Sequence, residues 1–116
     1  MSDLYWYKAR VDRAVDGDTL DVDIDCGLNI HTKQRCRLYG IDTPETYGVK
    51  KNSEEYKQGM IAKEFVVSQL EGKEVLIKTH KDKTGKYGRY LVTVFLGEVD
   101  FNNLLVEQGY AVKAEY

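Results

Sequence analysis

Five short β-prone segments and one long helix-like segment between the third and the fourth predict a mainly β, α+β fold. The 116 residues suit a single domain, residues 1–116, with a hydrophobic core of its own. Nine tyrosines against one tryptophan and three phenylalanines are typical of a β-rich chain. Short strands interrupted by one helix favour a small five-stranded closed barrel of the OB type with two packed helices.

The five strands are predicted from alternation of apolar and polar residues. Residues 5–14 alternate loosely, and residues 19–25 alternate cleanly between apolar residues and aspartates. Residues 30–41 read as a long third strand. Two later runs, residues 75–79 and 90–96, complete the set, and glycine-containing turns separate most of the strands.

Two helices are predicted around this sheet. The first covers residues 53–70, with Asn52 and Glu55 resembling a capping box and Gly72 following the end. The second covers residues 102–108 and stops at Gly109. The apolar residues of the first helix form a broad stripe that we expect to lie on the sheet: Tyr56, Met60, Ile61, Phe65, Val66 and Leu70.

Composition narrows the functional classes. Seventeen Lys and Arg against 19 Asp and Glu give a net charge of −2. This charge excludes a strongly basic protein that coats nucleic acid through its overall positive charge. No run of about 18 apolar residues exists to span a membrane. The first six residues lack the basic and apolar regions of a signal peptide, so we expect a cytoplasmic protein as given; a secreted mature form is the alternative. We also expect a monomer. Cys26 and Cys36 fall out of register on one hairpin, so no disulfide is expected.

Two acidic segments carry the first functional hint. Asp18 shares its alternation parity with inward-facing residues, whereas the aspartates at 21, 23 and 25 read as a solvated face. Downstream, Pro44 ends a strand within Asp42-Thr43-Pro44-Glu45. Asp18, Asp42 and the Thr43 carbonyl can together form an oxygen-only shell, which favours Ca²⁺ or another hard divalent ion over zinc, and Glu45 can hold a water for attack on phosphorus. A plain Asp-Gly turn and a helix N-cap are the structural alternatives.

Two arginines fit the same chemistry. Arg37 lies in a strand that turns apolar, and Arg89 directly precedes a strand. A guanidinium group donates paired hydrogen bonds to phosphoryl oxygens and never deprotonates, so it suits a charged phosphoryl transition state. Lys78, Lys81, Lys83 and Lys86 lead into Arg89, and this basic run reads either as a backbone contact for nucleic acid or as a solvated loop. The remaining arginines in the first third of the chain, Arg10, Arg13 and Arg35, read as surface charges.

Four ordered motifs resemble the staphylococcal nuclease (thermonuclease-like) family across residues 8–114. They are Asp16-Gly17-Asp18-Thr19, Arg37-Leu38-Tyr39-Gly40-Ile41-Asp42-Thr43-Pro44-Glu45, Asp82 to Arg89, and Glu107-Gln108-Gly109-Tyr110-Ala111. The resemblance implies an OB-type barrel that binds Ca²⁺ through Asp18, Asp42 and the Thr43 carbonyl. It also implies hydrolysis of DNA and RNA to products with 3′-phosphate ends.

The resemblance further implies individual roles. Glu45 matches a general base or water-orienting carboxylate, Arg37 and Arg89 match phosphate-binding arginines, and Lys86 and Tyr87 match contacts to a terminal phosphate. The sequence departs from the family at its nucleoside-stacking tyrosine, where Glu115 falls and Tyr116 follows one residue later.

Three functions remain open from the sequence. The first is a Ca²⁺-dependent nuclease acting on single-stranded DNA or RNA. The second is a catalytically weak or inactive OB-type module that binds nucleic acid or protein. The third is a structural Ca²⁺ domain, which leaves the arginines unexplained.

Overall fold

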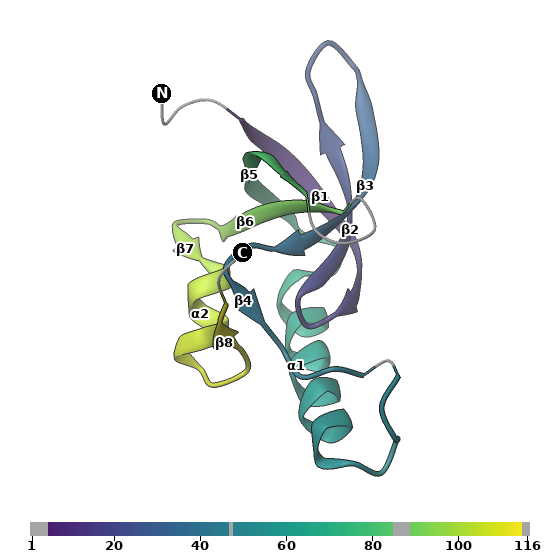
Figure 1. The fold of residues 1–116 in the computed structure, drawn as a ribbon. Helices are drawn as coiled ribbons and strands as arrows, with labels where there is room; N and C mark the ends of the chain where they lie inside the picture. Colours follow the sequence, from purple (N-terminus) through teal and green to yellow (C-terminus); the bar gives the residue numbers. More distant parts are fainter. Residues whose placement is uncertain (1–4, 47, 85–88, 115–116) are drawn as a thin grey trace.

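A computed structural model describes residues 5–46, 48–84 and 89–114 of the chain. Figure 1 shows a twisted β-barrel with a long helix below it and a short helix at one side. The elements run in this order: β1 (Trp6–Asp16), β2 (Thr19–Asp25), β3 (His31–Leu38), β4 (Ile41–Asp42), α1 (Glu54–Leu70), β5 (Glu74–Thr84), β6 (Tyr90–Leu96), β7 (Val99–Asp100), α2 (Phe101–Glu107) and β8 (Val112–Lys113).

Five of these strands close a mixed barrel, which confirms the predicted fold. The strand order is β3-β2-β1-β5-β6, and β6 pairs back with β3 to close the ring. Every neighbouring pair in this ring is antiparallel except β3 with β6, which is parallel. This parallel pair brings residues 36–38 beside residues 90–92, although more than fifty positions separate them in the sequence.

Alternation along the strands supplies the core. Each barrel strand turns one set of side chains inward, and the interior is filled by aliphatic residues from all five strands together with residues of both helices. The largest fully buried side chains are those of Phe101, Leu20, Leu38, Leu70, Ile77 and Leu105. Both cysteines are free, as predicted; Cys36 is buried and Cys26 is exposed.

Helix α1 lies against β1, and its start corrects the predicted cap. Ser53, not Asn52, is the N-cap, and its hydroxyl accepts a hydrogen bond from the Tyr56 amide. The packed face is narrower than the predicted stripe, because Gly59, Ala62, Val66 and Leu70 are buried whereas Ile61 is 48% exposed. Because the residues at 59 and 62 are small, α1 packs close to the neighbouring loops, and in this orientation Ile61 faces solvent.

Element boundaries bring further corrections. The predicted third strand, residues 30–41, stops at Leu38 because Gly40 adopts φ +80°. Residues 41–42 form the separate strand β4, which pairs with β8. The second helix begins at Phe101, one residue earlier than predicted, because Asp100 caps it by accepting from the Asn103 amide. Within the described residues, neither helix is both long and apolar enough to cross a membrane.

Candidate active site

Asp18 lies at the end of the β1–β2 hairpin with only 8% of its surface exposed. Its carboxylate accepts a hydrogen bond from the Thr19 hydroxyl at 3.1 Å and one from the Thr43 amide at 3.2 Å. Its carbonyl accepts from the Leu38 amide at 2.8 Å. The predicted inward position of Asp18 is therefore confirmed, and the contacts fix this carboxylate against the segment that carries Asp42 and Thr43.

Arg37 joins the two acidic segments. Its Nη2 lies 3.4 Å from Asp18 Oδ2 and forms a second ion pair with Asp42 Oδ1. The same nitrogen donates to the Ile41 carbonyl at 3.3 Å. Only 17% of the Arg37 side chain is exposed, against 50% for that of Asp42. Two carboxylates that are 24 residues apart in sequence thus converge on one positively charged atom.

The chemistry of this convergence fits a hard cation. Asp18 and Asp42 offer carboxylate oxygens, and the Thr43 carbonyl adds a neutral oxygen, with neither sulfur nor imidazole among these donors. Among the residues that the structure describes, no group of three or more His, Cys, Asp or Glu side chains is preassembled as a metal centre. Arg37 forms ion pairs with both carboxylates, and its single positive charge offsets one of their two negative charges.

The turn from Thr43 to Thr46 is held at three points. Besides the Thr43 amide on Asp18, the Thr46 hydroxyl donates to Asp16 Oδ1 at 3.0 Å. The Glu45 amide donates to Glu55 Oε2 on α1 at 3.4 Å. These contacts place the exposed side chain of Glu45 on the same side of the barrel as Asp18 and Asp16.

Two carboxyl groups of this region have raised pKa values. Partial desolvation is the largest cause for Glu45, although the residue as a whole is exposed, and the charges of Asp18 and Asp16 raise its pKa further. Burial is also the largest cause for Asp16, where the hydrogen bond from Thr46 acts in the opposite direction. Burial is therefore the main cause of both raised pKa values, and neighbouring negative charge adds to it.

The second predicted arginine, Arg89, lies directly before β6. Arg89 is partly exposed and precedes Tyr90, the first residue of β6. Because Leu91 pairs with Arg37 in the parallel β3–β6 ladder, Arg89 lies two positions from the strand residue beside Arg37. The predicted substrate contacts Lys86 and Tyr87 lie outside the described residues, as do Glu115 and Tyr116.

Two residues of the site were missed by sequence reasoning. Asp16 appeared only as part of an Asp-Gly turn, and Gly59 only as a helix residue. A Cβ atom at Gly59 would lie 2.6 Å from the Pro44 carbonyl oxygen and 2.6 Å from Thr46 Cγ2. A glycine inside a helix is unfavourable by about 0.5–1 kcal/mol relative to alanine. This unfavourable placement was the one feature of the sequence that could have indicated a packing role for Gly59.

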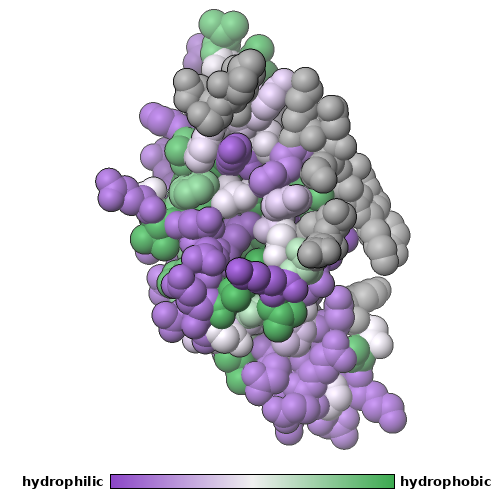
Figure 2. Space-filling view, turned by 60° about the vertical axis from the view of Figure 1, so that its left-hand side comes forward, coloured by the Kyte–Doolittle hydropathy of each residue, from purple (hydrophilic) through white to green (hydrophobic). Residues whose placement is uncertain are grey.

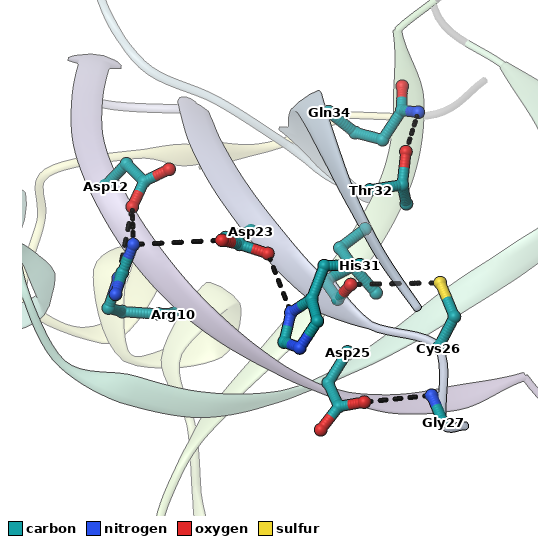
Figure 3. Close-up of polar contacts among 10 residues, drawn as sticks. Arg10, Asp12, Asp23, Asp25, Cys26, Gly27, His31, Thr32 and Gln34 are labelled. Atoms are coloured by element: carbon teal, nitrogen blue, oxygen red, sulfur yellow. Dashed lines mark hydrogen bonds and ion pairs between the residues drawn. The ribbon is translucent and has the colours of Figure 1, made fainter. Parts of the chain in front are cut away.

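The arginines predicted to be surface charges are confirmed as such. Arg10, Arg13 and Arg35 have half or more of their side chains exposed and pair with aspartates of the solvated face. Figure 3 shows Arg10 between Asp12 and Asp23. It also shows His31 Nδ1 at 3.0 Å from Asp23. Arg35 is the closest partner of Asp21, at 2.8 Å, and this hydrogen bond lowers the pKa of Asp21.

The fold and the site define a class of small β-barrel domains with carboxylates and an arginine gathered at one rim. The chain belongs to the staphylococcal nuclease homologue family, whose model matches residues 35–116. It is 37% identical over 102 residues to the thermonuclease of Staphylococcus hyicus, covering 88% of this chain and 56% of that protein. It is 38% identical over 101 residues to the thermonuclease of Staphylococcus intermedius, with 87% and 56% covered.

A larger relative contains the same unit. The chain is 33% identical over 116 aligned residues to the endonuclease YhcR of Bacillus subtilis, covering 90% of this chain and 9% of that protein. The chain spans about half the length of the two thermonucleases, 56% in each case. The comparisons therefore establish the family of this domain.

Proposed function

We propose that this domain is a Ca²⁺-dependent nuclease that hydrolyses DNA and RNA to products with 3′-phosphate ends. The observation that carries the proposal is the convergence of Asp18 and Asp42 at one nitrogen of Arg37. Membership of the staphylococcal nuclease homologue family and the similarity to two thermonucleases support it. Asp18, Asp42 and the Thr43 carbonyl would hold the metal. When bound, calcium supplies a fixed positive charge that stabilises charge on a phosphoryl oxygen and lowers the pKa of a bound water.

The arginines have the chemistry to bind the substrate phosphate. Arg37 is largely buried, so its charge is only partly screened by solvent. Its guanidinium group and that of Arg89 can donate to the phosphoryl oxygens, on which negative charge accumulates in the transition state. Loss of one such donor typically costs about 10²–10³ in rate.

Glu45 is our candidate for the residue that orients the attacking water. Its amide is hydrogen-bonded to Glu55, and the turn on which it lies is anchored to Asp16 and Asp18. An anchored carboxylate can accept a proton from the attacking water as the water oxygen bonds to phosphorus and the bond from phosphorus to the 5′ oxygen breaks. The departing 5′ oxygen takes a proton from solvent, and the proton on Glu45 later passes to solvent. General base catalysis of this type typically contributes about 10²–10⁴ in rate.

The test is cleavage of single-stranded DNA by the wild type and three variants, with Ca²⁺ and with a chelator. Glu45→Gln and Arg89→Ala are expected to lose about 10²-fold or more in rate. Arg35→Ala is the matched control, because Arg35 is a surface arginine paired with Asp21, and it is expected to cleave like the wild type. Binding without cleavage by the wild type in every condition would replace the proposal with the nucleic-acid-binding module.

A further inference from the structure

A second feature of the barrel lies on the outer wall of β1, β5 and β6. Alternation turns Trp6 of β1, Lys78 of β5 and Thr93 of β6 to the outside, and the strand registers place them in one row: Trp6 opposite Lys78, and Lys78 opposite Thr93. Their inward neighbours on the same strands, such as Ile77 and Val94, are fully buried. We call this row, with Phe95, His80 and Tyr39, the aromatic strip.

The members of the aromatic strip contact one another. The rings of Trp6 and Phe95 have centroids 5.2 Å apart, and Lys78 Nζ lies 5.5 Å from the Trp6 ring centroid. The rings of Tyr39 and His80 are stacked at 3.8 Å, and His80 Nε2 lies 2.9 Å from the Thr93 hydroxyl. Each of these side chains is partly exposed, so the strip presents π-surface and positive charge together.

The aromatic strip is continuous with the candidate active site. Tyr39 follows Arg37 by two residues, and its amide donates to the Val92 carbonyl at 2.7 Å, which prolongs the alignment of β3 with β6. From there the row crosses β6 and β5 to reach β1. Three steps between neighbouring strands, each of about 4.8 Å, give a path of about 14 Å. A polymer whose phosphate lay at Arg37 would be carried directly onto this wall.

Charge distinguishes this wall from its neighbour. On the outer face of β1–β2–β3, Asp12, Asp21 and Asp23 are paired with arginines, whereas Lys78 on the wall of the strip lies opposite the uncharged residues Trp6 and Thr93. On β5, Glu74 lies at the end of the strand away from His80 and pairs with Arg10 of β1. Figure 2 brings the left side of Figure 1 forward and shows hydrophobic patches divided by hydrophilic residues, without one continuous apolar area. Such a mixture suits a chain that is both aromatic and anionic.

We propose that the aromatic strip binds the single-stranded nucleic acid that flanks the cleaved phosphate. Bases stack on the rings of the strip, and Lys78 contacts a backbone phosphate. Stacking and an electrostatic groove are the two devices by which OB-type proteins bind single strands without sequence preference. The inference rests on the proposed function, because it extends the substrate path of the same site.

The chain contains a built-in probe of the aromatic strip, because Trp6 is its one tryptophan. We would titrate the protein in chelator with an oligothymidylate of about twelve residues, a length within the range bound by one OB fold, and with a thymidine dinucleotide. The expected result is quenching of Trp6 emission by the long oligomer and much weaker quenching by the dinucleotide. No change in emission at saturating oligomer would overturn the inference.

A pair of charge reversals supplies the control. Lys78→Glu is expected to weaken binding of the long oligomer about tenfold and to lower the slope of log affinity against log salt by at least about one. Lys33→Glu reverses an exposed lysine on the other wall and is expected to change binding much less. Equal losses for the two variants would contradict a local contact. If the wild type binds the oligomer with quenching of Trp6 emission but never cleaves DNA, the proposed nuclease activity is refuted and the proposed binding by the aromatic strip stands. If the wild type cleaves DNA but the oligomer does not quench Trp6 emission, only the proposal for the aromatic strip is refuted.

Discussion

Replacing Gly59 by alanine tests how the turn that carries Glu45 is positioned. Gly59 has no positive φ, so the absence of a side chain, and not backbone freedom, is what the site uses. The added Cβ would lie 2.6 Å from the Pro44 carbonyl oxygen, against an ordinary contact of at least 3.4 Å. The turn that carries Glu45 must therefore move away from α1 by about 0.8 Å, the difference between these two distances.

The size of the effect follows from two opposing terms. Alanine favours the helix by about 0.5–1 kcal/mol over glycine. Overpacking against a rigid neighbour costs about 1–3 kcal/mol, and a backbone carbonyl cannot rotate out of the way as a side chain can. We expect a net loss of about 1 kcal/mol in the free energy of unfolding. A displacement approaching 1 Å at a catalytic group can cost about 10²-fold in rate.

The assay compares Gly59→Ala with Lys57→Ala, an exposed position on the same helix. Urea unfolding gives stability, and amide chemical shifts of residues 43–46 report the position of the turn without any need for activity. Adding Thr46→Ser removes the second close atom, Cγ2, while keeping the hydroxyl that donates to Asp16. The double variant should therefore recover part of the loss. A Gly59→Ala protein that is more stable than the wild type and equally active would show that close packing at Gly59 does not set the position of the turn.

Two further predictions concern groups outside the site. In the native protein one thiol, that of Cys26, should react with a disulfide reagent. Burial raises the pKa of Cys36 to about 12, so this thiol should stay unreactive until denaturant is added. Reaction of both thiols in native buffer would contradict this prediction. Asp21→Asn should lower stability at neutral pH by no more than about 1 kcal/mol, since its partner Arg35 is half exposed. Because the pKa of Asp21 is lowered in the folded protein, its contribution to stability is present above the unfolded pKa of about 3.9 and is lost as pH falls through the folded value. The stabilities of the wild type and the variant should therefore converge in acid denaturation. A constant difference in stability down to low pH would count against the pairing.

Local patterns predicted the strands that carry clear alternation. Residues 19–25 and 90–96 form β2 and β6 with the predicted bounds, because most of each strand alternates between buried and more exposed side chains. The strands β7 and β8 have two residues each, too few for any periodicity, and they exist because of pairing with β6 and β4. Predicting them would have required the tertiary arrangement.

The same limit applies to the site. Parity predicted that Asp18 faces inward, and proline chemistry predicted the break after Thr43. The hydrogen bond from the Thr43 amide to Asp18 joins a residue beside the β2–β3 pairing to the residue after β4, which pairs with the distant β8, and no local pattern encodes that arrangement. The close packing of the Pro44–Thr46 turn against Gly59 and the aromatic strip were missed for the same reason, since each arises from contacts between distant segments. The roles assigned to Glu45 and the arginines remain predictions.

Calcium-dependent cleavage by two aspartate variants of the same strand region decides whether Asp18 belongs to the proposed metal shell. Asp18→Asn removes a buried carboxylate of the proposed metal shell, whereas Asp23→Asn removes a surface carboxylate paired with Arg10 and His31. With single-stranded DNA and Ca²⁺, we predict cleavage by the wild type and Asp23→Asn, and little by Asp18→Asn. Equal cleavage by Asp18→Asn, or undiminished wild-type cleavage in chelator, would contradict the account.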